Sequence, residues 1–196
     1  MVGLGNPGDR YTGTRHNVGF DVVETFAKRL SGGPPRIDRL DCRALTGRVK
    51  VAGRPVLVAR PQTFMNLSGE SVKGLTTKYE IPLPRLIVVS DDTALPVGQI
   101  RLRRAGTSGG QKGLQSIIEA FGADAFPRLR LGVRGDNFRP GDDQADYVLS
   151  RFSKVERPLV EESTGRACDA LETWATEGID AAMNRFNRSL EEAPEN

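Results

Sequence analysis

The stretch Gly5-Asn6-Pro7-Gly8-Asp9-Arg10-Tyr11-Thr12-Gly13-Thr14-Arg15-His16-Asn17 holds the only histidine of the chain. Its glycines and its proline disfavour both helix and strand, so the sequence predicts an ordered loop here. Imidazole changes charge near neutral pH without help from its surroundings, which makes His16 a candidate proton acceptor. A lone histidine is also commonly a surface or capping residue. The rest of the chain has to decide between these two interpretations.

Composition places the chain among folded, water-soluble proteins. Its 196 residues are enough for one domain with its own hydrophobic core. Apolar residues make up 38% and charged residues 27%, which is typical of globular rather than disordered chains. No apolar run approaches the roughly 18 residues of a membrane helix, and the N-terminal residues show no signal-peptide pattern. We therefore expect a cytoplasmic protein without membrane contact.

The cysteines argue against zinc. Cys42 and Cys168 lie far apart, outside any CxxC spacing, and with one histidine they do not readily supply four zinc ligands. We expect no metal. The formal net charge of +3 permits a polyanionic partner without requiring one.

Around the loop, the apolar pattern predicts alternating strands and helices. Residues 1–4 resemble a strand cut short, because strands usually need about five residues. Asn17 is a suitable N-cap for a helix that runs to about residue 30. Segments 45–51 and 55–59 are of β type and predict a hairpin, and a further helix should bury Val72, Leu75 and Tyr79.

A central strand then leads to a pair of carboxylates. The continuous apolar run Leu86-Ile87-Val88-Val89 is typical of a strand covered on both faces, and it should end at Ser90-Asp91-Asp92. Ligands of open α/β sheets collect at the carboxyl ends of strands. Asp91 and Asp92 are therefore candidate site residues.

Two later strands, over residues 98–104 and 129–134, flank a glycine-rich loop at 106–113 that opens a helix. Their alternation predicts a basic sheet face that could meet phosphates, although charge alone fits an ordinary solvated face equally well. The basic residues concerned are Arg101, Arg103, Arg104, Lys112, Arg128, Arg130 and Arg134. Beyond them we expect a surface loop at 135–146, helices at 155–176 and 179–186, and a frayed tail at 191–196.

Two glycine motifs lack the context that their usual functions need. The segment Gly3–Gly8 matches the GxGxxG pattern of NAD-binding folds, but Pro7 and Gly13 keep the chain irregular where a helix should begin. The segment Gly106–Gly110 matches the GxSxG pattern of serine hydrolases, which place their histidine after the serine. His16 precedes Ser108 in this chain, so we reject both functions.

Asp91 is better suited to orienting a histidine than to holding a metal, because no further ligands cluster around it in the sequence. A carboxylate bonded to imidazole selects its tautomer and stabilises its protonated form. The chain offers no convincing nucleophilic serine or cysteine, so water is the natural nucleophile.

Taken together, these segments resemble the bacterial-type peptidyl-tRNA hydrolase family over nearly the whole chain. The resemblance rests on Gly3–Gly8, Tyr11, Thr14–Asn17, Pro61–Gly69, Asp91-Asp92, Leu95-Pro96, Gly98, Gly109-Gly110, Gly113-Leu114, Phe126–Gly132 and Tyr147–Leu149. It implies one α/β domain over residues 1–190, with a mixed, mostly parallel sheet flanked by helices. It also implies a monomer that uses no metal or cofactor.

The activity implied by the resemblance is hydrolysis of the ester between a peptide and the 3′ end of tRNA, which recycles stalled peptidyl-tRNA. The family pattern implies that His16 is the general base, that Asp91 holds it, and that Asn6 separates peptidyl-tRNA from aminoacyl-tRNA. Substrate and acceptor-stem phosphate contacts are implied for Tyr11, Phe64, Met65, Asn66, Arg103, Lys112 and Arg130.

The chain departs from the family pattern beside the expected site. The family usually reads Gly-Gly-His-Asn-Gly where this chain has Gly109-Gly110-Gln111-Lys112-Gly113, and Thr93-Ala94 replace the usual Leu-Asp. Lysine donates hydrogen bonds but cannot accept them, so Lys112 cannot reproduce both halves of an asparagine contact. We expect retained activity with altered substrate contacts. The alternative is a catalytically silent RNA-binding relative that has kept the fold and its basic face.

Overall fold

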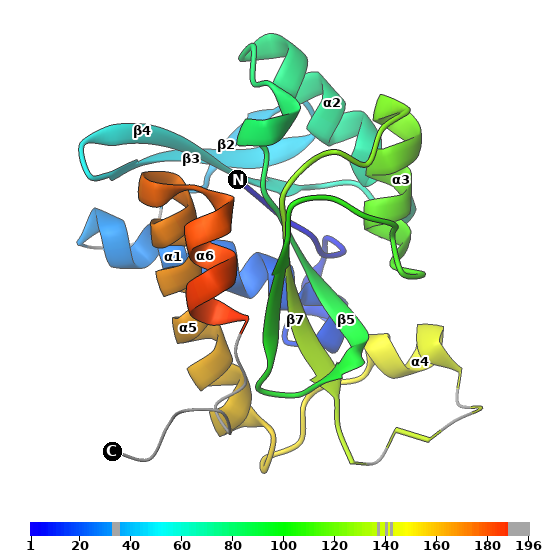
Figure 1. The fold of residues 1–196 in the computed structure, drawn as a ribbon. Helices are drawn as coiled ribbons and strands as arrows, with labels where there is room; N and C mark the ends of the chain where they lie inside the picture. The colour runs from blue at the N-terminus through cyan, green and yellow to red at the C-terminus, as the bar shows by residue number, and fades with distance from the viewer. Residues whose placement is uncertain (33–35, 137, 140, 142, 188–196) are drawn as a thin grey trace, which may run out of the picture.

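The computed structural model describes residues 1–32, 36–136, 138–139, 141 and 143–187, which build a seven-stranded sheet of order β2-β3-β4-β1-β5-β7-β6 (Figure 1). The strands are β1 (Val2–Gly3), β2 (Arg39–Asp41), β3 (Ala44–Val51), β4 (Arg54–Pro61), β5 (Val88–Pro96), β6 (Ile100–Arg103) and β7 (Arg128–Arg134). The helices are α1 (Val18–Ser31), α2 (Ser68–Lys78), α3 (Lys112–Phe121), α4 (Gln144–Leu149), α5 (Arg157–Glu177) and α6 (Ile179–Phe186).

The sheet is mixed, as expected. Strands β4, β1, β5 and β7 run parallel at its centre, whereas β2, β3 and β6 pair in antiparallel fashion toward its edges. Helices α1, α5 and α6 cover one face of the sheet and α2 and α3 cover the other (Figure 1). The single α/β fold implied by the resemblance is confirmed.

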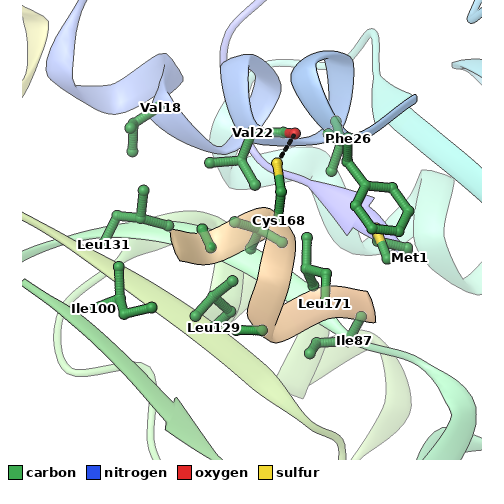
Figure 2. Close-up of a cluster of buried hydrophobic side chains, with 14 of the residues drawn as sticks. Met1, Val18, Val22, Phe26, Ile87, Ile100, Leu129, Leu131, Cys168 and Leu171 are labelled. Atoms are coloured by element: carbon green, nitrogen blue, oxygen red, sulfur yellow. Dashed lines mark hydrogen bonds between the residues drawn. The ribbon is translucent and has the colours of Figure 1, made fainter. Parts of the chain in front are cut away.

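One core cluster lies between α1, α5 and the sheet. Figure 2 shows Cys168 and Leu171 of α5 packed between Val22 of α1 and Leu129 of β7. Burial raises the pKa of the Cys168 thiol to about 12, so this cysteine serves as a small apolar side chain.

Close packing of α1 on the sheet brings the predicted loop to the strand carrying the aspartates. A Cβ atom on Gly19 would lie 2.5 Å from the carbonyl oxygen of Val89 and 2.6 Å from that of Leu4. Only glycine lets the helix approach β1 and β5 this closely. Because His16 lies one turn before Gly19, the approach places it beside Asp91.

The strand β5 is longer than predicted. Its regular pairing with β7 ends at Asp92, but the chain stays extended and pairs again at Pro96 with Arg134 after a register shift. The predicted end at Asp91-Asp92 is thus the end of regular pairing, not of the strand. Such irregularities commonly re-aim side chains at functional sites.

The predicted basic face was only partly right. The register sets Arg101 opposite Arg130 and Arg103 opposite Arg128, on one face of the sheet as expected. Arg128, however, is only 1% exposed and donates to carbonyl oxygens of Gly106, Thr107, Asp124 and Phe126. It holds the glycine-rich loop and is not available to phosphate.

The predicted loop at 135–146 overlaps helix α4. The carboxylate of Asp143 caps this helix by accepting from the backbone N–H of Ala145 at 2.7 Å. The predicted tail at 191–196 lies outside the described residues. No described helix has both the length and the apolar character that a membrane crossing requires.

Candidate active site

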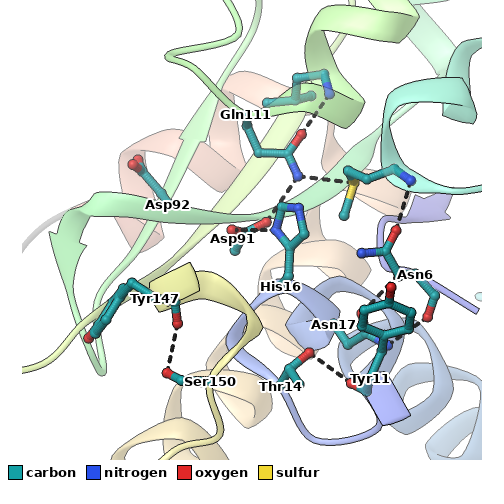
Figure 3. A network of polar contacts seen from close by, with 12 residues as sticks. Asn6, Tyr11, Thr14, His16, Asn17, Asp91, Asp92, Gln111, Tyr147 and Ser150 are labelled. Carbon is teal, nitrogen blue, oxygen red and sulfur yellow. Dashed lines mark hydrogen bonds and ion pairs between the residues drawn. The ribbon is translucent and has the colours of Figure 1, made fainter. Parts of the chain in front are cut away.

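His16 and Asp91 form a buried pair, as predicted. The Nδ1 atom of His16 lies 2.9 Å from Oδ2 of Asp91 (Figure 3), and the two residues are 8% and 3% exposed. Within the described residues, the other ring nitrogen of His16 has no hydrogen-bond partner. If Nδ1 carries the proton and donates it to the carboxylate, Nε2 keeps a free lone pair for chemistry.

The pair faces a cavity of about 840 Å³. Most of the predicted site residues line it, and they come from the ends of different elements. These lining residues are Asn6, His16, Phe64, Met65, Asn66, Asp91, Lys112 and Arg130. The described residues of the lining include no serine or cysteine, and Ser108 is not among them. The cavity therefore supplies a base without a serine or cysteine nucleophile.

Asn6 is held from both sides of its backbone. The side chain of Asn17 accepts from the Asn6 N–H at 2.9 Å and donates to the Asn6 carbonyl oxygen at 3.0 Å. Asn17 occupies the N-cap position of α1, as predicted, but its side chain makes no capping bond to the helix. Asn6 Oδ1 accepts from the Met65 N–H at 2.8 Å. The amide nitrogen of Asn6 is thereby left for a ligand.

Arg15 is a structural residue of the site that the sequence did not reveal. It is 1% exposed, and its guanidinium lies between the rings of Tyr147 and Phe152, at 4.6 and 4.7 Å from their centroids. It also donates to Glu156 at 2.8 Å and to the Val133 carbonyl oxygen at 3.0 Å. Burial alone would raise the pKa of the Glu156 carboxyl, but hydrogen bonds from Arg15 and Ser153 hold it below its usual value.

Through Tyr147, Arg15 connects the turn that carries His16 to helix α4, which the sequence analysis did not predict. Helix α4 contributes Gln144, Ala145, Val148 and Leu149 to the cavity wall. Its capping Asp143 could have been noticed as a helix signal within the predicted loop. The partners of Arg15 are more than a hundred positions away in sequence, so no local signal could have found them.

The remaining predicted residues differ in their relation to the cavity. Phe64 is 55% exposed at its mouth, and Arg130 Nε lies 3.0 Å from Asp92 Oδ2 in an ion pair within it. Tyr11 and Arg103 do not line it. Tyr11 instead carries the guanidinium of Arg10 over its ring at 4.4 Å. Contacts by Tyr11 and Arg103 would therefore have to be made outside the cavity.

No group of three or more His, Cys, Asp or Glu side chains placed to hold a metal ion occurs in the described part of the chain. The fold and the site define an α/β enzyme whose buried His–Asp pair opens onto a large cavity. The chain belongs to the peptidyl-tRNA hydrolase family, because the model of that family matches residues 1–194.

Individual relatives agree with the family match. The chain is 46% identical to the peptidyl-tRNA hydrolase of Alkaliphilus metalliredigens and 42% identical to that of Syntrophomonas wolfei, in both cases over 95% of this chain and 98% of the relative. A crystal structure of peptidyl-tRNA hydrolase from Acinetobacter baumannii superposes with a TM-score of 0.86 at 31% identity. That match covers 95% of this chain and 92% of the other.

Proposed function

We propose that this protein hydrolyses the ester bond between the peptide and the 3′ end of tRNA in peptidyl-tRNA, with His16 as general base. The observation that carries the proposal is the His16–Asp91 pair at 2.9 Å, which faces a cavity with no serine or cysteine in its described lining. A base with no serine or cysteine beside it is suited to activating water. Family membership supports the substrate class.

The positions of these residues support the following reaction. The oxygen of a water molecule attacks the ester carbonyl carbon while Nε2 of His16 takes its proton, and Asp91 stabilises the resulting imidazolium. The C–O bond to the ribose then breaks, and the 3′ oxygen of the tRNA takes the proton back from Nε2. The products are a peptide with a free carboxyl group and a free tRNA. The amide of Asn66 would polarise the substrate by donating to it.

Asn6 would discriminate peptidyl-tRNA from aminoacyl-tRNA. Its Oδ1 is already occupied by the Met65 N–H, so Asn6 can offer a ligand only its N–H groups. Peptidyl-tRNA has an amide carbonyl next to the esterified residue and can accept this bond. Aminoacyl-tRNA has a charged amine there, which is itself a donor. Binding of aminoacyl-tRNA would therefore bring this amine against the N–H donors of Asn6 with no acceptor between them.

The same surface would bind the end of the tRNA. Phe64 offers an exposed ring on which a base can stack, and Lys112 and Arg130 offer cations to phosphate. Tyr11 and Arg103, which lie off the cavity, would contact the tRNA further along the acceptor stem. We propose that the enzyme works as a monomer, as the resemblance to the family implies.

Release of peptide from an N-blocked aminoacyl-tRNA, measured beside the unblocked form, tests the function. We expect hydrolysis of the blocked substrate only, with kcat/KM falling at acid pH because a protonated imidazole cannot accept a proton. Tight tRNA binding without release of peptide at any pH would instead favour the RNA-binding alternative. A flat pH profile would argue against His16 as base.

Lys112→Asn tests the phosphate contact. Lys112 is exposed at the start of α3 and lines the cavity. Removing its charge should lower the slope of log(kcat/KM) against log[salt] by about 1, because one fewer phosphate is neutralised. KM should change as well, because the asparagine amide can both donate to the substrate and accept from it. Lys50→Asn, on the distant β3–β4 hairpin, is the control and should leave KM and the salt slope unchanged. Identical kcat, KM and salt slope in the Lys112 variant and the parent would exclude substrate contact at this position.

A further inference from the structure

Gln111 makes a contact with the catalytic pair that the sequence comparison did not suggest. It occupies the N-cap position of α3 and is 8% exposed. Its Nε2 donates to Asp91 Oδ1 at 3.0 Å (Figure 3), while its Oε1 accepts from the Leu114 N–H at 2.7 Å. One side chain therefore caps the helix and holds the carboxylate.

The orientation of this amide follows from its two partners. If the amide were flipped, Oε1 would face the carboxylate of Asp91 and Nε2 would face the N–H of Leu114. Both contacts would be repulsive, so the network itself assigns the nitrogen to Asp91. Nε2 also lies 3.3 Å from the sulfur of Met65, whose backbone N–H is bonded to Asn6.

The result is a carboxylate held at both oxygens. Oδ2 of Asp91 meets His16 and Oδ1 meets Gln111, and burial at 3% exposure removes bulk water as a competing donor. A carboxylate held only through His16 could rotate about its terminal torsion, which is a soft one. The second bond opposes this rotation.

Close packing surrounds the side chain of Gln111, which holds Asp91. The first turn of α3 presses on the same side chains: a Cβ atom on Gly113 would lie 2.5 Å from the Met65 sulfur and 3.1 Å from Oε1 of Gln111. Gly113 thus lets the start of α3 pack closely against both side chains, which restricts the space open to the amide. The N-cap residue of helix α3 thereby contacts the His16–Asp91 pair, although the helix contributes neither member of it.

We propose that Gln111 is a positioning residue that, through Asp91, keeps the proton of His16 on Nδ1 and the lone pair of Nε2 toward the substrate. This proposal rests on the function proposed above. It adds Gln111 as a third residue to the His16–Asp91 pair. The glycine-rich loop and the start of α3 would then help to orient the base.

Two substitutions separate positioning from capping. Gln111→Ser keeps a good N-cap oxygen for Leu114 but is too short to reach Asp91. Gln111→Met removes both bonds at similar length. We expect both variants to lower kcat about 10- to 100-fold, because small misplacements of a catalytic group cost about this much, with KM within twofold. Only the Met variant should also lose about 2–4 °C in Tm, which corresponds to one lost cap.

Nitrogen NMR measures the tautomer of His16 and so tests the positioning role of Gln111 without an activity assay. The chain contains a single histidine, so ring-labelled histidine in untagged protein reports on His16 alone. The parent should show Nδ1 protonated and Nε2 unprotonated. Both Gln111 variants should shift toward the Nε2–H tautomer, while Gln115→Met, an exposed glutamine on the same helix, should match the parent.

Each result decides the proposal. Parent-like tautomers with parent-like kcat in both Gln111 variants would overturn it. A rise in KM with unchanged kcat would also overturn it, since it would place Gln111 in substrate binding. If the parent protein releases no peptide from blocked substrate, the proposed function fails. The NMR arm still decides the positioning role in that case.

Discussion

His16→Ala is expected to lower kcat by about 10²- to 10⁴-fold, the usual contribution of a general base. In the part of the chain that the structure describes, this imidazole is buried against a carboxylate at 2.9 Å and opens to the cavity through an unbonded nitrogen. Without it, water must attack unassisted. KM should change little, because His16 acts on the water and not on the tRNA. Single-turnover release of peptide from a blocked substrate measures the effect.

The pH profile provides the control for this substitution. The parent should lose activity at acid pH, whereas the residual activity of His16→Ala should lack this decline, because the proton acceptor is gone. Unchanged tRNA affinity and Tm would show that the variant is folded. A kcat within tenfold of the parent would contradict the role of His16 as base.

Asp91→Asn should lower kcat about as much as His16→Ala does, although the substitution changes the side-chain volume very little. Its amide would have to fit between the Gln111 Nε2 donor and His16 Nδ1. The amide oxygen satisfies Gln111, which leaves the new NH₂ facing Nδ1. The histidine must then carry its proton on Nε2, where it blocks proton transfer from water. A loss of about 10²- to 10⁴-fold in kcat is expected, as when a triad acid is made neutral.

The neighbouring residue supplies the comparison for Asp91→Asn. Successive side chains of a strand point to opposite faces, and Asp92 meets Arg130 at 3.0 Å, whereas Asp91 meets His16. Asp92→Asn removes a charge from the same cavity but should leave the His16 tautomer as in the parent. An equal shift of the tautomer in both variants would mean that the loss is not specific to the bond with His16.

Local patterns determined most of the secondary structure. Helix α6 matches its predicted range of residues 179–186, and the β3–β4 hairpin and helices α1 and α5 lie within a few residues of prediction. The spacing of apolar residues, and the glycines or prolines that end an element, determine these helices and strands locally. Asp143 carried the same kind of signal for α4, but the polar composition around it favoured a loop.

The pairing of elements depended on the tertiary structure. Strand β1 is too short to identify reliably by pattern, yet it lies between β4 and β5 because its neighbours supply its hydrogen bonds. The alternating arginines of β7 suggested an exposed face, but Arg128 is buried, and backbone carbonyls accept hydrogen bonds from both of its terminal nitrogens. Sequence periodicity cannot report partners of this kind, since it sees only the strand itself.

For the site, the sequence by itself determined the chemistry: a single histidine, an aspartate after a buried strand, and the asparagines of the family pattern. Only the tertiary structure decided their geometry. Arg15 and Gln111 became part of the site through bonds to residues 141 and 20 positions away, and Tyr11 and Arg103 fell outside the cavity. Residue types set what a group can do, whereas the packing of helices on the sheet sets which groups meet.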